Sequence, residues 1–434
     1  MSALSTVEDD PEGPDAPERP LPGLLVVCLA GQPRLLAIPL VRGTLVLGRE
    51  GDGGLEDERV SRAHTEVSQQ AGRFRVRDLG SRNGTYVDGV RLSGDLVVAG
   101  GALLRLGGTL AIPLPDVRPF VRADVVSTDG LVAGPTFRRA LDAVTAAAQS
   151  SDTLLVTGES GTGKELAAKR FHAAGPHRAG RFVAVNCAAI PEHLAERLLF
   201  GAQRGAYTGA TAAEGHVQAA AGGVLFLDEV AELHLDVQAK LLRLLEEREI
   251  IPLGASVAEP VAVRICCATH RDLRAAVTGQ RLRPDLYYRL TKQQIRLPAL
   301  RERREEIPHL VAGVLAGVPG APRAHVRFLE QCLLRPWPGN VRELSSATRR
   351  AAEAAVAAGE ASVDPRHLGA DAGLPLEASS SAPNTATAPT QAEVEAALER
   401  NGRNVAQTAR DLGLHRNQLY RLLERLGIKL RDEA

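Results

Sequence analysis

A glycine-rich loop between an apolar stretch and a helix-forming stretch constrains the fold of this 434-residue chain more than any other feature. Residues 153–157 form the apolar stretch, which is typical of a buried strand. Glycines let the backbone approach a ligand closely, and a loop between a strand and a helix directs its N–H groups towards phosphate oxygens. We therefore predict a nucleotide phosphate site formed by Gly158, Glu159, Ser160, Gly161, Thr162, Gly163, Lys164 and Glu165.

A second apolar stretch, residues 222–229, reads as a buried strand that ends in the two carboxylates Asp228 and Glu229. Asp228 can hold Mg²⁺ as a metal ligand, Glu229 can orient an attacking water, and Lys164 brings positive charge to the terminal phosphates. The loop alone also fits a plain glycine-rich turn with a surface lysine. The second strand favours the nucleotide site, so we predict an ATP-hydrolysing α/β domain with ATP and Mg²⁺ as cofactors.

The amino-acid composition limits the classes of protein to which this chain can belong. The chain has 52 basic and 52 acidic residues and is 44% hydrophobic, which allows several cores and excludes a globally basic chain. The five cysteines show no metal-ligand spacing, so we expect reduced, buried thiols and a cytoplasmic protein. The acidic, proline-rich start is unlike a signal peptide, and no apolar run approaches the roughly 20 residues of a membrane span.

The string from Gly158 to Glu165 departs from the generic phosphate loop, because Glu165 replaces the usual Ser or Thr. It resembles the AAA+ ATPases of bacterial enhancer-binding proteins, which activate sigma-54 RNA polymerase. The resemblance implies an α/β ATPase core over residues 131–297 and a helical lid over residues 298–370. It also implies that Asn186 is a switch that hydrogen-bonds the catalytic Glu229.

The same resemblance assigns roles to three arginines. Arg283 and Arg289 are implied to be fingers that reach the nucleotide of a neighbouring subunit in a homo-oligomeric ring, a hexamer in this family. Arg342 is implied to contact the nucleotide of its own subunit. His270 stands where the family has an asparagine that senses the γ-phosphate, so nucleotide sensing by this chain is an open question.

A loop between the two ATPase segments resembles the one with which this family contacts sigma-54. Small residues and glycines flank a single aromatic ring, which is typical of a mobile loop tip; an ordinary glycine hairpin is the alternative. Tyr207 replaces the usual phenylalanine and keeps the ring. The implied contact residues are Gly205, Ala206, Tyr207, Thr208, Gly209 and Ala210.

Residues 24–112 have short alternating strands and glycine-rich turns, which predict an antiparallel β-sandwich. Three loop motifs resemble a forkhead-associated (FHA) domain, a reader of phosphothreonine peptides. The resemblance implies that Arg49, Ser61 and Arg62 hold the phosphate and that Asn83 holds the peptide backbone, with His64 and Gly84 shaping the loops. Exposed arginines on an ordinary sandwich are the alternative.

The remaining segments are a predicted disordered tail (residues 1–23), a linker (residues 113–130), a flexible linker (residues 371–390) and a C-terminal all-α domain (residues 391–434). Two predicted helices joined by a turn with Gly413, in a locally basic segment, favour DNA binding over a plain helical hairpin. The segment resembles the Fis-type helix-turn-helix. We predict base contacts by Arg416, Asn417, Gln418 and Arg421.

Together these features predict a multidomain, ATP-driven transcriptional activator that binds enhancer DNA and remodels the closed complex of sigma-54 RNA polymerase. Its FHA domain implies control by a phosphothreonine protein, for example a Ser/Thr kinase or a kinase substrate. The alternative is an FHA-containing DNA-binding repressor or scaffold with a weakened ATPase, for which His270 is the evidence. An ATP-driven chaperone would not need the helix-turn-helix.

Overall fold

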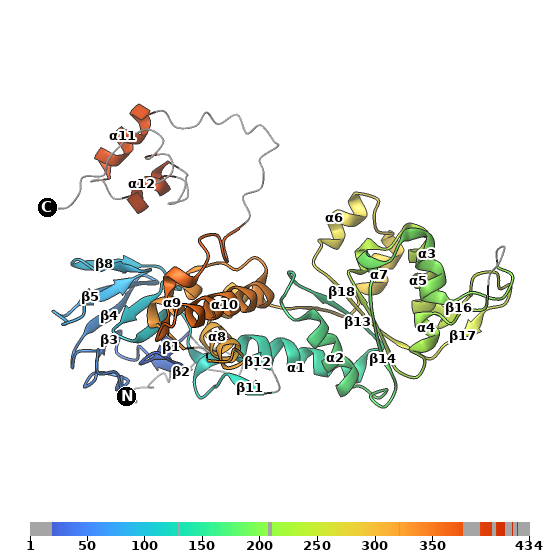
Figure 1. The fold of residues 1–434 in the computed structure, drawn as a ribbon, viewed down its shortest axis with the longest axis horizontal. Coiled ribbons are helices and arrows are strands. Elements are labelled where there is room, and N and C mark those ends of the chain that lie inside the picture. Colours follow the sequence, from blue (N-terminus) through green and yellow to red (C-terminus); the bar gives the residue numbers. More distant parts are fainter. Residues whose placement is uncertain are drawn as a thin grey trace, which may run out of the picture. The chain divides into compact units, whose positions relative to one another are not determined.

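A computed structural model of the chain describes residues 20–128, 131–206, 211–320, 322–375, 391–401 and 405–412, with Leu419 and Leu423. The chain divides into two compact units, Met1–Pro375 and Leu376–Ala434. The first contains the predicted sandwich, ATPase core and lid, and the second contains the predicted DNA-binding helices (Figure 1).

The first unit begins with the predicted antiparallel sandwich. One sheet has the order β2-β1-β10-β9-β6-β7 and the other the order β3-β4-β5-β8. Alternation builds the core between the two sheets, because Phe74 and Val76 of β5 point inward while Arg73 and Arg77 are exposed. The strands are β1 (Gly23–Leu29), β2 (Gln32–Pro39), β3 (Thr44–Leu47), β4 (Thr65–Gln70), β5 (Arg73–Asp78), β6 (Thr85–Val87), β7 (Val90–Arg91), β8 (Asp95–Val98), β9 (Leu104–Leu106) and β10 (Thr109–Leu114).

The boundaries of the sandwich differ from the prediction at both ends. The predicted tail included residues 20–23, but the carbonyl oxygen of Leu21 accepts a hydrogen bond from the N–H of Val117 at 2.8 Å. The predicted linker is also partly folded, since it contains a 3₁₀ helix, η1 (Arg118–Phe120), and a strand, β11 (Val126–Thr128). Strand β11 pairs with β12 (Leu131–Ala133). Both segments are ordered because their backbone groups find partners in neighbouring strands and turns.

The ATPase core is a five-stranded parallel sheet with the order β14-β15-β18-β13-β19. Its strands are nearly continuous apolar runs, as expected when both faces of a sheet are covered. Asn186 pairs with Asp228 and Thr157 pairs with Thr269, so the carboxyl ends of four strands meet at one edge. The strands are β13 (Thr153–Thr157), β14 (Phe182–Asn186), β15 (Val224–Asp228), β18 (Arg264–Thr269) and β19 (Gln294–Arg296).

Helices flank this sheet and connect its strands (Figure 1). They are α1 (Pro135–Ser150), α2 (Lys164–Ala174), α3 (Glu192–Phe200), α4 (His216–Ala219), α5 (Leu235–Glu247), α6 (Leu273–Thr278) and α7 (Pro284–Leu290). A small strand pair, β16 (Glu249–Ile250) and β17 (Glu259–Pro260), follows α5. All five cysteines are buried and free, as predicted. Burial raises the pKa of the Cys28, Cys187 and Cys332 thiols to about 12.

The lid consists of α8 (Ile307–Ala316), α9 (Val326–Leu334) and α10 (Asn340–Ala357), with the short strands β20 (Arg323–Ala324) and β21 (Ser362–Val363). It extends beyond the predicted end at residue 370. Gly373 donates its N–H to Glu343 Oε1 at 2.8 Å and accepts from the N–H of Trp337 at 3.0 Å. Gly373 has φ +72° and lies against the buried Trp337 ring, where a side chain would collide. Residues 371–375 of the predicted flexible linker therefore belong to the first unit, and the rest of that linker lies outside the described residues.

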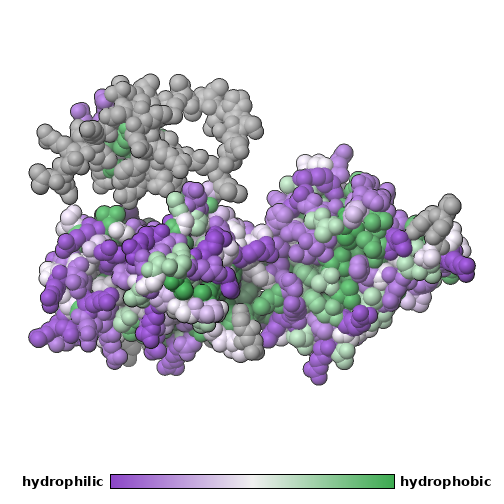
Figure 2. Space-filling model, in the orientation of Figure 1, coloured by the Kyte–Doolittle hydropathy of each residue, from purple (hydrophilic) through white to green (hydrophobic). Residues whose placement is uncertain are grey.

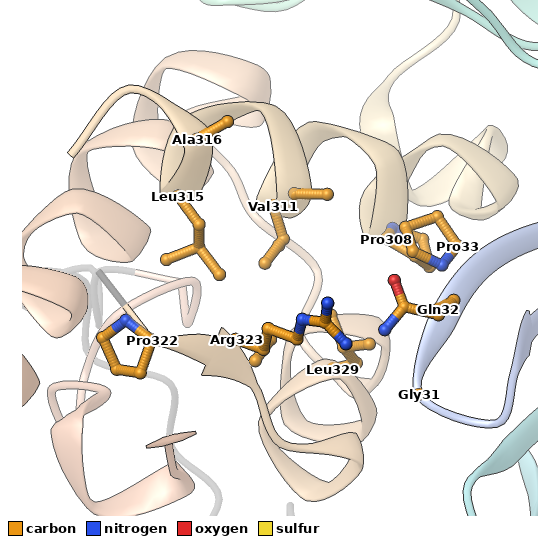
Figure 3. Close-up of a pocket in the computed structure, with 12 residues that line it drawn as sticks. Gly31, Gln32, Pro33, Pro308, Val311, Leu315, Ala316, Pro322, Arg323 and Leu329 are labelled. Carbon is orange, nitrogen blue, oxygen red and sulfur yellow. The ribbon is translucent and has the colours of Figure 1, made fainter. Parts of the chain in front are cut away.

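The sandwich and the lid share one hydrophobic cluster. Apolar side chains of β1 and β10 on the outer face of the sandwich pack against the lid helices, and the cluster includes Leu25, Val27, Leu110, Val311, Phe328 and Leu329. Arg105 of β9 and Glu330 of α9 form a buried ion pair, with 2.9 Å between Nε and Oε2. A cavity of about 220 Å³ lies where Gly31 and the start of β2 meet α8, β20 and Leu329 (Figure 3).

The second unit contains α11 (Gln391–Arg400) and α12 (Val405–Asp411). Their apolar side chains form a small core with Leu419 and Leu423, comprising Val394, Leu398, Val405, Ala409, Leu419 and Leu423. Leu419 and Leu423 are four residues apart, a spacing that places both on one face of a helix. The four predicted DNA contacts, Arg416, Asn417, Gln418 and Arg421, lie outside the described residues.

The described surface is mainly polar. Figure 2 shows a largely hydrophilic face over the first unit, with a smaller apolar area over the ATPase core. Within the described ranges, no helix has the length and apolar character needed to cross a membrane.

Candidate functional site

A cavity of about 540 Å³ lies at the carboxyl edge of the parallel sheet, between the sheet and the lid. The cavity brings together segments that are far apart in the sequence. It is lined by most of the predicted phosphate loop, by both predicted carboxylates, by Asn186 and by Arg342 of the lid. Its lining includes Ser160, Gly161, Thr162, Gly163, Lys164, Glu165, Asn186, Asp228, Glu229, Arg303 and Arg342.

The phosphate loop curls around the ammonium group of Lys164. Lys164 Nζ donates to the carbonyl oxygens of Gly158 at 3.2 Å and Glu159 at 3.4 Å. Gly163 has φ +104°, a left-handed conformation that turns the chain into α2 at Lys164. The loop therefore presents a helix N-terminus and a buried lysine to the cavity, which is the arrangement that binds phosphate.

Hydrogen bonds connect the phosphate loop to the lid. Arg301 makes two hydrogen bonds to the carboxylate of Glu159, at 2.8 and 2.6 Å, and these hold the pKa of Glu159 below its usual range. Asn340 Nδ2 donates to the same carboxylate at 3.1 Å, and Arg342 donates to Ser160 Oγ at 3.0 Å. A Cβ at Gly161 would lie only 2.3 Å from the carbonyl oxygen of Gly339. Glu159 thus joins the loop to the lid, a role that the sequence did not reveal.

The two carboxylates differ in charge environment. Burial and the neighbouring Glu229 charge raise the pKa of Asp228. Burial also opposes the ionisation of Glu229, but a hydrogen bond from His270 and the charge of Lys164 hold the pKa of Glu229 below its usual value. Glu229 has φ +55°, a conformation that is uncommon outside glycine and that often marks a functional site.

Glu229 is held by His270, not by Asn186. His270 Nδ1 lies 2.8 Å from Glu229 Oε2, and Lys164 Nζ lies 3.6 Å from Glu229 Oε1. Among the described residues Asn186 makes no hydrogen bond to Glu229, so the contact that the resemblance implied is not formed in this structure. Asn186 Oδ1 instead accepts the N–H of Ala188 at 3.0 Å, because the 3₁₀ helix η2 (Cys187–Ala189) needs a cap for its first donors.

The two predicted finger arginines lie outside the cavity lining of their own chain. Arg283 precedes α7, is 40% exposed and pairs with Asp285, with 2.8 Å between Nη2 and Oδ2. Arg289 Nη2 donates to the carbonyl oxygen of Leu245 at 2.7 Å. Buried Gln238 of α5 accepts the N–H of Arg283 at 2.9 Å, which fixes the backbone at the start of α7.

The predicted sigma-54 loop is described only at its base. Ala202 and Ala213 exchange two backbone hydrogen bonds of 2.9 Å and form an isolated bridge at the base of the loop. Gly205 lies in a turn and Ala206 in a bend that follow Ala202. The tip, Tyr207, Thr208, Gly209 and Ala210, lies outside the described residues.

The three FHA motifs converge at one end of the sandwich. The N–H of Arg49 donates to the carbonyl oxygen of Ser61 at 3.1 Å. His64 is buried; its Nδ1 accepts the N–H of Ser61 at 3.0 Å, so its Nε2 is the donor to the carbonyl oxygen of Gly84, at 3.3 Å. Burial lowers the pKa of His64, which keeps the ring neutral and in this tautomer. His64 therefore braces two loops, as the resemblance implied.

The surface between these loops suits an anion. Arg49 and Arg62 are exposed. A cavity of about 450 Å³ lies beside Arg62, but Glu50 and Asp52 also line it, and Arg49, Ser61 and Asn83 do not. Ser61 Oγ accepts the N–H of Arg82 at 3.2 Å, which leaves the hydroxyl proton free to donate. Asn83 Nδ2 donates to the carbonyl oxygen of Arg59 at 2.6 Å.

Glu50 is the residue at this surface that sequence reasoning missed. Its carboxylate lies 3.4 Å from Arg62 Nε, and both side chains are largely exposed. A phosphate bound to Arg62 Nε would compete with this carboxylate. Glu50 directly follows Arg49 in the sequence, and this position was the signal that could have identified it as a neighbour of the predicted phosphate site.

Three segments of the chain match known domain families. Residues 131–296 match the sigma-54 interaction domain, residues 45–107 match the FHA domain, and residues 391–426 match the Fis family of bacterial regulatory proteins. Their order agrees with the order predicted from the sequence.

Relatives match over most of the chain. The transcriptional regulatory protein GlrR of Escherichia coli K12 is 39% identical over 309 residues, which cover 69% of this chain and 68% of the relative. The anaerobic nitric oxide reductase transcription regulator NorR of Klebsiella pneumoniae is 42% identical over 316 residues, covering 65% of this chain and 58% of the relative. A crystal structure of NtrX from Brucella abortus in complex with ADP aligns with a TM-score of 0.52 at 28% identity, covering 70% of each chain. The chain therefore belongs to the family of sigma-54-dependent transcriptional activators, with an FHA domain before its AAA+ ATPase and a Fis-type helix-turn-helix after it.

Proposed function

We propose that this protein hydrolyses ATP in a homo-oligomeric ring, a hexamer by family, to remodel the closed promoter complex of sigma-54 RNA polymerase. The observation that carries the proposal is the cavity that brings together Lys164, Asp228, Glu229 and Arg342 from the sheet and the lid. Structures of the relative NtrX contain ADP or ATP, which supports a nucleotide in the same place.

The residues around the cavity fit Mg²⁺ together with ATP. Asp228 is a half-buried carboxylate beside a second acid, and burial and that neighbour disfavour its charge unless a cation compensates. Glu165, which replaces the usual hydroxyl ligand, is exposed and pairs with Lys169 at 2.8 Å, so Asp228 is the residue to hold the metal. When bound, Mg²⁺ neutralises charge on the phosphate oxygens.

Different residues of the chain have different roles in ATP hydrolysis. The loop N–H groups and Lys164 bind the β- and γ-phosphates, and Arg342 closes the lid over them. Glu229 orients the attacking water and accepts its proton. Arg283 and Arg289 act on the nucleotide of the neighbouring subunit; Arg283 is exposed enough to exchange Asp285 for a phosphate.

Open-complex formation tests the proposal directly. Purified protein should open a sigma-54 promoter that carries its enhancer when ATP is present, and should fail with a non-hydrolysable analogue. ATP binding without hydrolysis or opening would instead favour the alternative, a DNA-binding repressor or scaffold with a weakened ATPase.

The tip of the sigma-54 loop gives a sharper prediction. Tyr207→Ala should retain ATP hydrolysis and lose promoter opening, because the loop contacts sigma-54 while the catalytic groups lie elsewhere. Tyr207→Phe keeps the ring and is the matched control, so it should open promoters normally. If Tyr207→Ala opens promoters as well as the wild type does, the loop assignment is wrong.

We propose further that a phosphothreonine protein controls the ATPase through the FHA domain. The supporting observation is that the sandwich and the lid share a hydrophobic cluster and a buried ion pair. Arg303 and Arg304 extend this connection. Arg303 donates to the carbonyl oxygen of Thr162 in the phosphate loop at 2.8 Å, and Arg304 donates to that of Gly101 in the sandwich. A phosphopeptide that prefers one lid position would shift the nucleotide affinity, and nucleotide would shift the phosphopeptide affinity equally.

Arg62→Ala should lower the affinity for a phosphothreonine peptide at least about tenfold, because a hydrogen bond to a charged group contributes about 1.5–3 kcal/mol. Titration of a labelled peptide measures this, with the unphosphorylated peptide as background. Arg73→Ala, an exposed arginine on β5, is the matched control and should leave the affinity unchanged. Basal ATPase activity should persist in both variants. Unchanged affinity in Arg62→Ala would remove Arg62 from the site.

A further inference from the structure

We propose that His270 is the positioning residue for Glu229 and makes the hydrogen bond to Glu229 that the family resemblance gave to Asn186. The inference rests on the proposed ATPase function and deepens it. It starts from the three contacts that Glu229 Oε2 receives. The His270 ring lies at 2.8 Å through Nδ1, the N–H of His270 donates at 3.2 Å, and the hydroxyl of Thr269 donates at 3.4 Å.

The direction of the ring contact follows from the chemistry of the carboxylate. Its oxygens accept hydrogen bonds, and the N–H of His270 and the hydroxyl of Thr269 donate to Glu229 Oε2. His270 Nδ1 must then carry a proton and donate it. Thr269 Oγ1 accepts the N–H of Arg271 at 3.1 Å, which directs its own proton towards Glu229. All three groups are thus donors aimed at one carboxylate oxygen.

The three contacts on Oε2, called the anchor here, leave the other carboxylate oxygen of Glu229, Oε1, facing the catalytic cavity. Glu229 Oε1 lies 3.6 Å from Lys164 Nζ, and the residue lines the cavity. Three contacts from the end of β18 restrain Oε2, and this favours one orientation of Oε1 relative to the phosphate loop. A water bound to Oε1 is therefore held on one side, which is the positioning that a proton acceptor requires.

The anchor also lies close to the nucleotide. The N–H of Gly158, the first residue of the phosphate loop, donates to the carbonyl oxygen of Thr269 at 3.3 Å. His270 is the next residue along the chain. A shift of the loop on phosphate binding is therefore transmitted to the anchor through a single residue. Among the described residues the Asn186 side chain makes no hydrogen bond to the phosphate loop and caps η2 instead.

Side-chain length predicts which substitutions preserve the anchor. In asparagine, Nδ2 is as many bonds from the backbone as Nδ1 is in histidine, so His270→Asn retains a donor with the same reach. Phenylalanine keeps a planar ring and removes the donor. His234 supplies a matched control, because it is 48% exposed and pairs with Glu192 at 3.3 Å, while His270 is 47% exposed.

The test compares steady-state ATP hydrolysis by the full-length variants. His270→Phe should lower kcat about 10- to 100-fold, by analogy with the loss of a group that orients a metal ligand, with KM for ATP nearly unchanged. His270→Asn should restore most of the lost kcat, and His234→Phe should leave kcat as in the wild type. Unchanged kcat in His270→Phe would overturn the inference, as would a loss that His270→Asn does not repair.

A double-mutant cycle separates this inference from the proposed function. If His270 acts through Glu229, His270→Phe should have little further effect on kcat in a Glu229→Gln background; independent, multiplying effects would contradict it. If the wild type hydrolyses no ATP, the proposed function fails. The thermal unfolding midpoints of the same four proteins then decide whether the pair exists, since additive shifts would show that the two side chains do not interact.

Discussion

Glu229→Gln is expected to lower kcat for ATP hydrolysis by about 10²- to 10⁴-fold, the range for loss of a positioned proton acceptor. ATP binding should be retained, because Lys164, the loop N–H groups and Arg342 remain in place. Glutamine has the same shape as glutamate, and its amide oxygen can still accept from His270. The substitution therefore removes basicity and charge while keeping the geometry.

Phosphate release measures turnover in this experiment, and a fluorescent ATP analogue measures binding. Glu232→Gln is the matched control, because Glu232 lies three residues further along the chain, pairs with Arg271 and does not line the cavity. Its turnover should match that of the wild type. If Glu229→Gln turns over at the wild-type rate, another group accepts the proton and the assignment of Glu229 is wrong.

Local sequence patterns predicted the parts of the site that are local in the chain. The phosphate loop and the strand ending at Asp228 could be predicted because each is a strand followed by residues whose chemistry is visible in sequence. In the parallel sheet the carboxyl ends of these strands lie at the same edge, so the phosphate loop and Asp228 come together once the sheet has formed. The FHA loops were predictable for the same reason, since each motif lies in one turn between alternating strands.

Contacts between distant residues were not predictable in this way. Asn186 ends a strand, where capping the next turn competes with reaching across to Glu229, and in this structure the cap is formed. His270 and Glu229 are 41 residues apart, and Arg105 and Glu330 are 225 apart. Pairing at such separations depends on the folded chain, not on local pattern.

One sequence signal for the sandwich–lid interface was nevertheless present. Leu24, Leu25, Val26, Val27 and Cys28 are consecutive apolar residues of β1, and all are at most 2% exposed. A strand in a sandwich with one solvated face should alternate. The unbroken apolar run indicates that both faces of β1 are covered, one by the opposite sheet and the other by the lid.

The ion pair inside that interface leads to a large expected effect on stability. Glu330→Ala should destabilise the first unit by about 3–5 kcal/mol, because it leaves the Arg105 guanidinium buried without its partner. Arg105 and Glu330 side chains are only 9% and 4% exposed, and the guanidinium also lies 3.7 Å above the Tyr86 ring. Lower thermal unfolding midpoints and faster proteolysis between the sandwich and the lid should report the loss.

Two further variants show whether charge burial is the cause. Changing both partners, Arg105→Met with Glu330→Leu, removes the isolated charge and should recover most of the stability, as buried ion pairs replaced by apolar side chains often do. Asp95→Ala breaks the exposed Arg75–Asp95 pair of the same sandwich and should cost at most about 1 kcal/mol. Equal losses of stability in Asp95→Ala and Glu330→Ala would mean that burial does not make the Arg105–Glu330 pair more important for stability than an exposed pair.

The same variants test how the FHA domain would control the ATPase. Arg62 lies at the loops and Glu330 at the lid, so Glu330→Ala should bind a phosphothreonine peptide like the wild type while its ATPase no longer responds to the peptide. The apolar double variant keeps the sandwich packed on the lid, so its ATPase should still respond. A response that survives in Glu330→Ala would show that the signal bypasses this interface and reaches the phosphate loop by another route, for example through the partners in the ring.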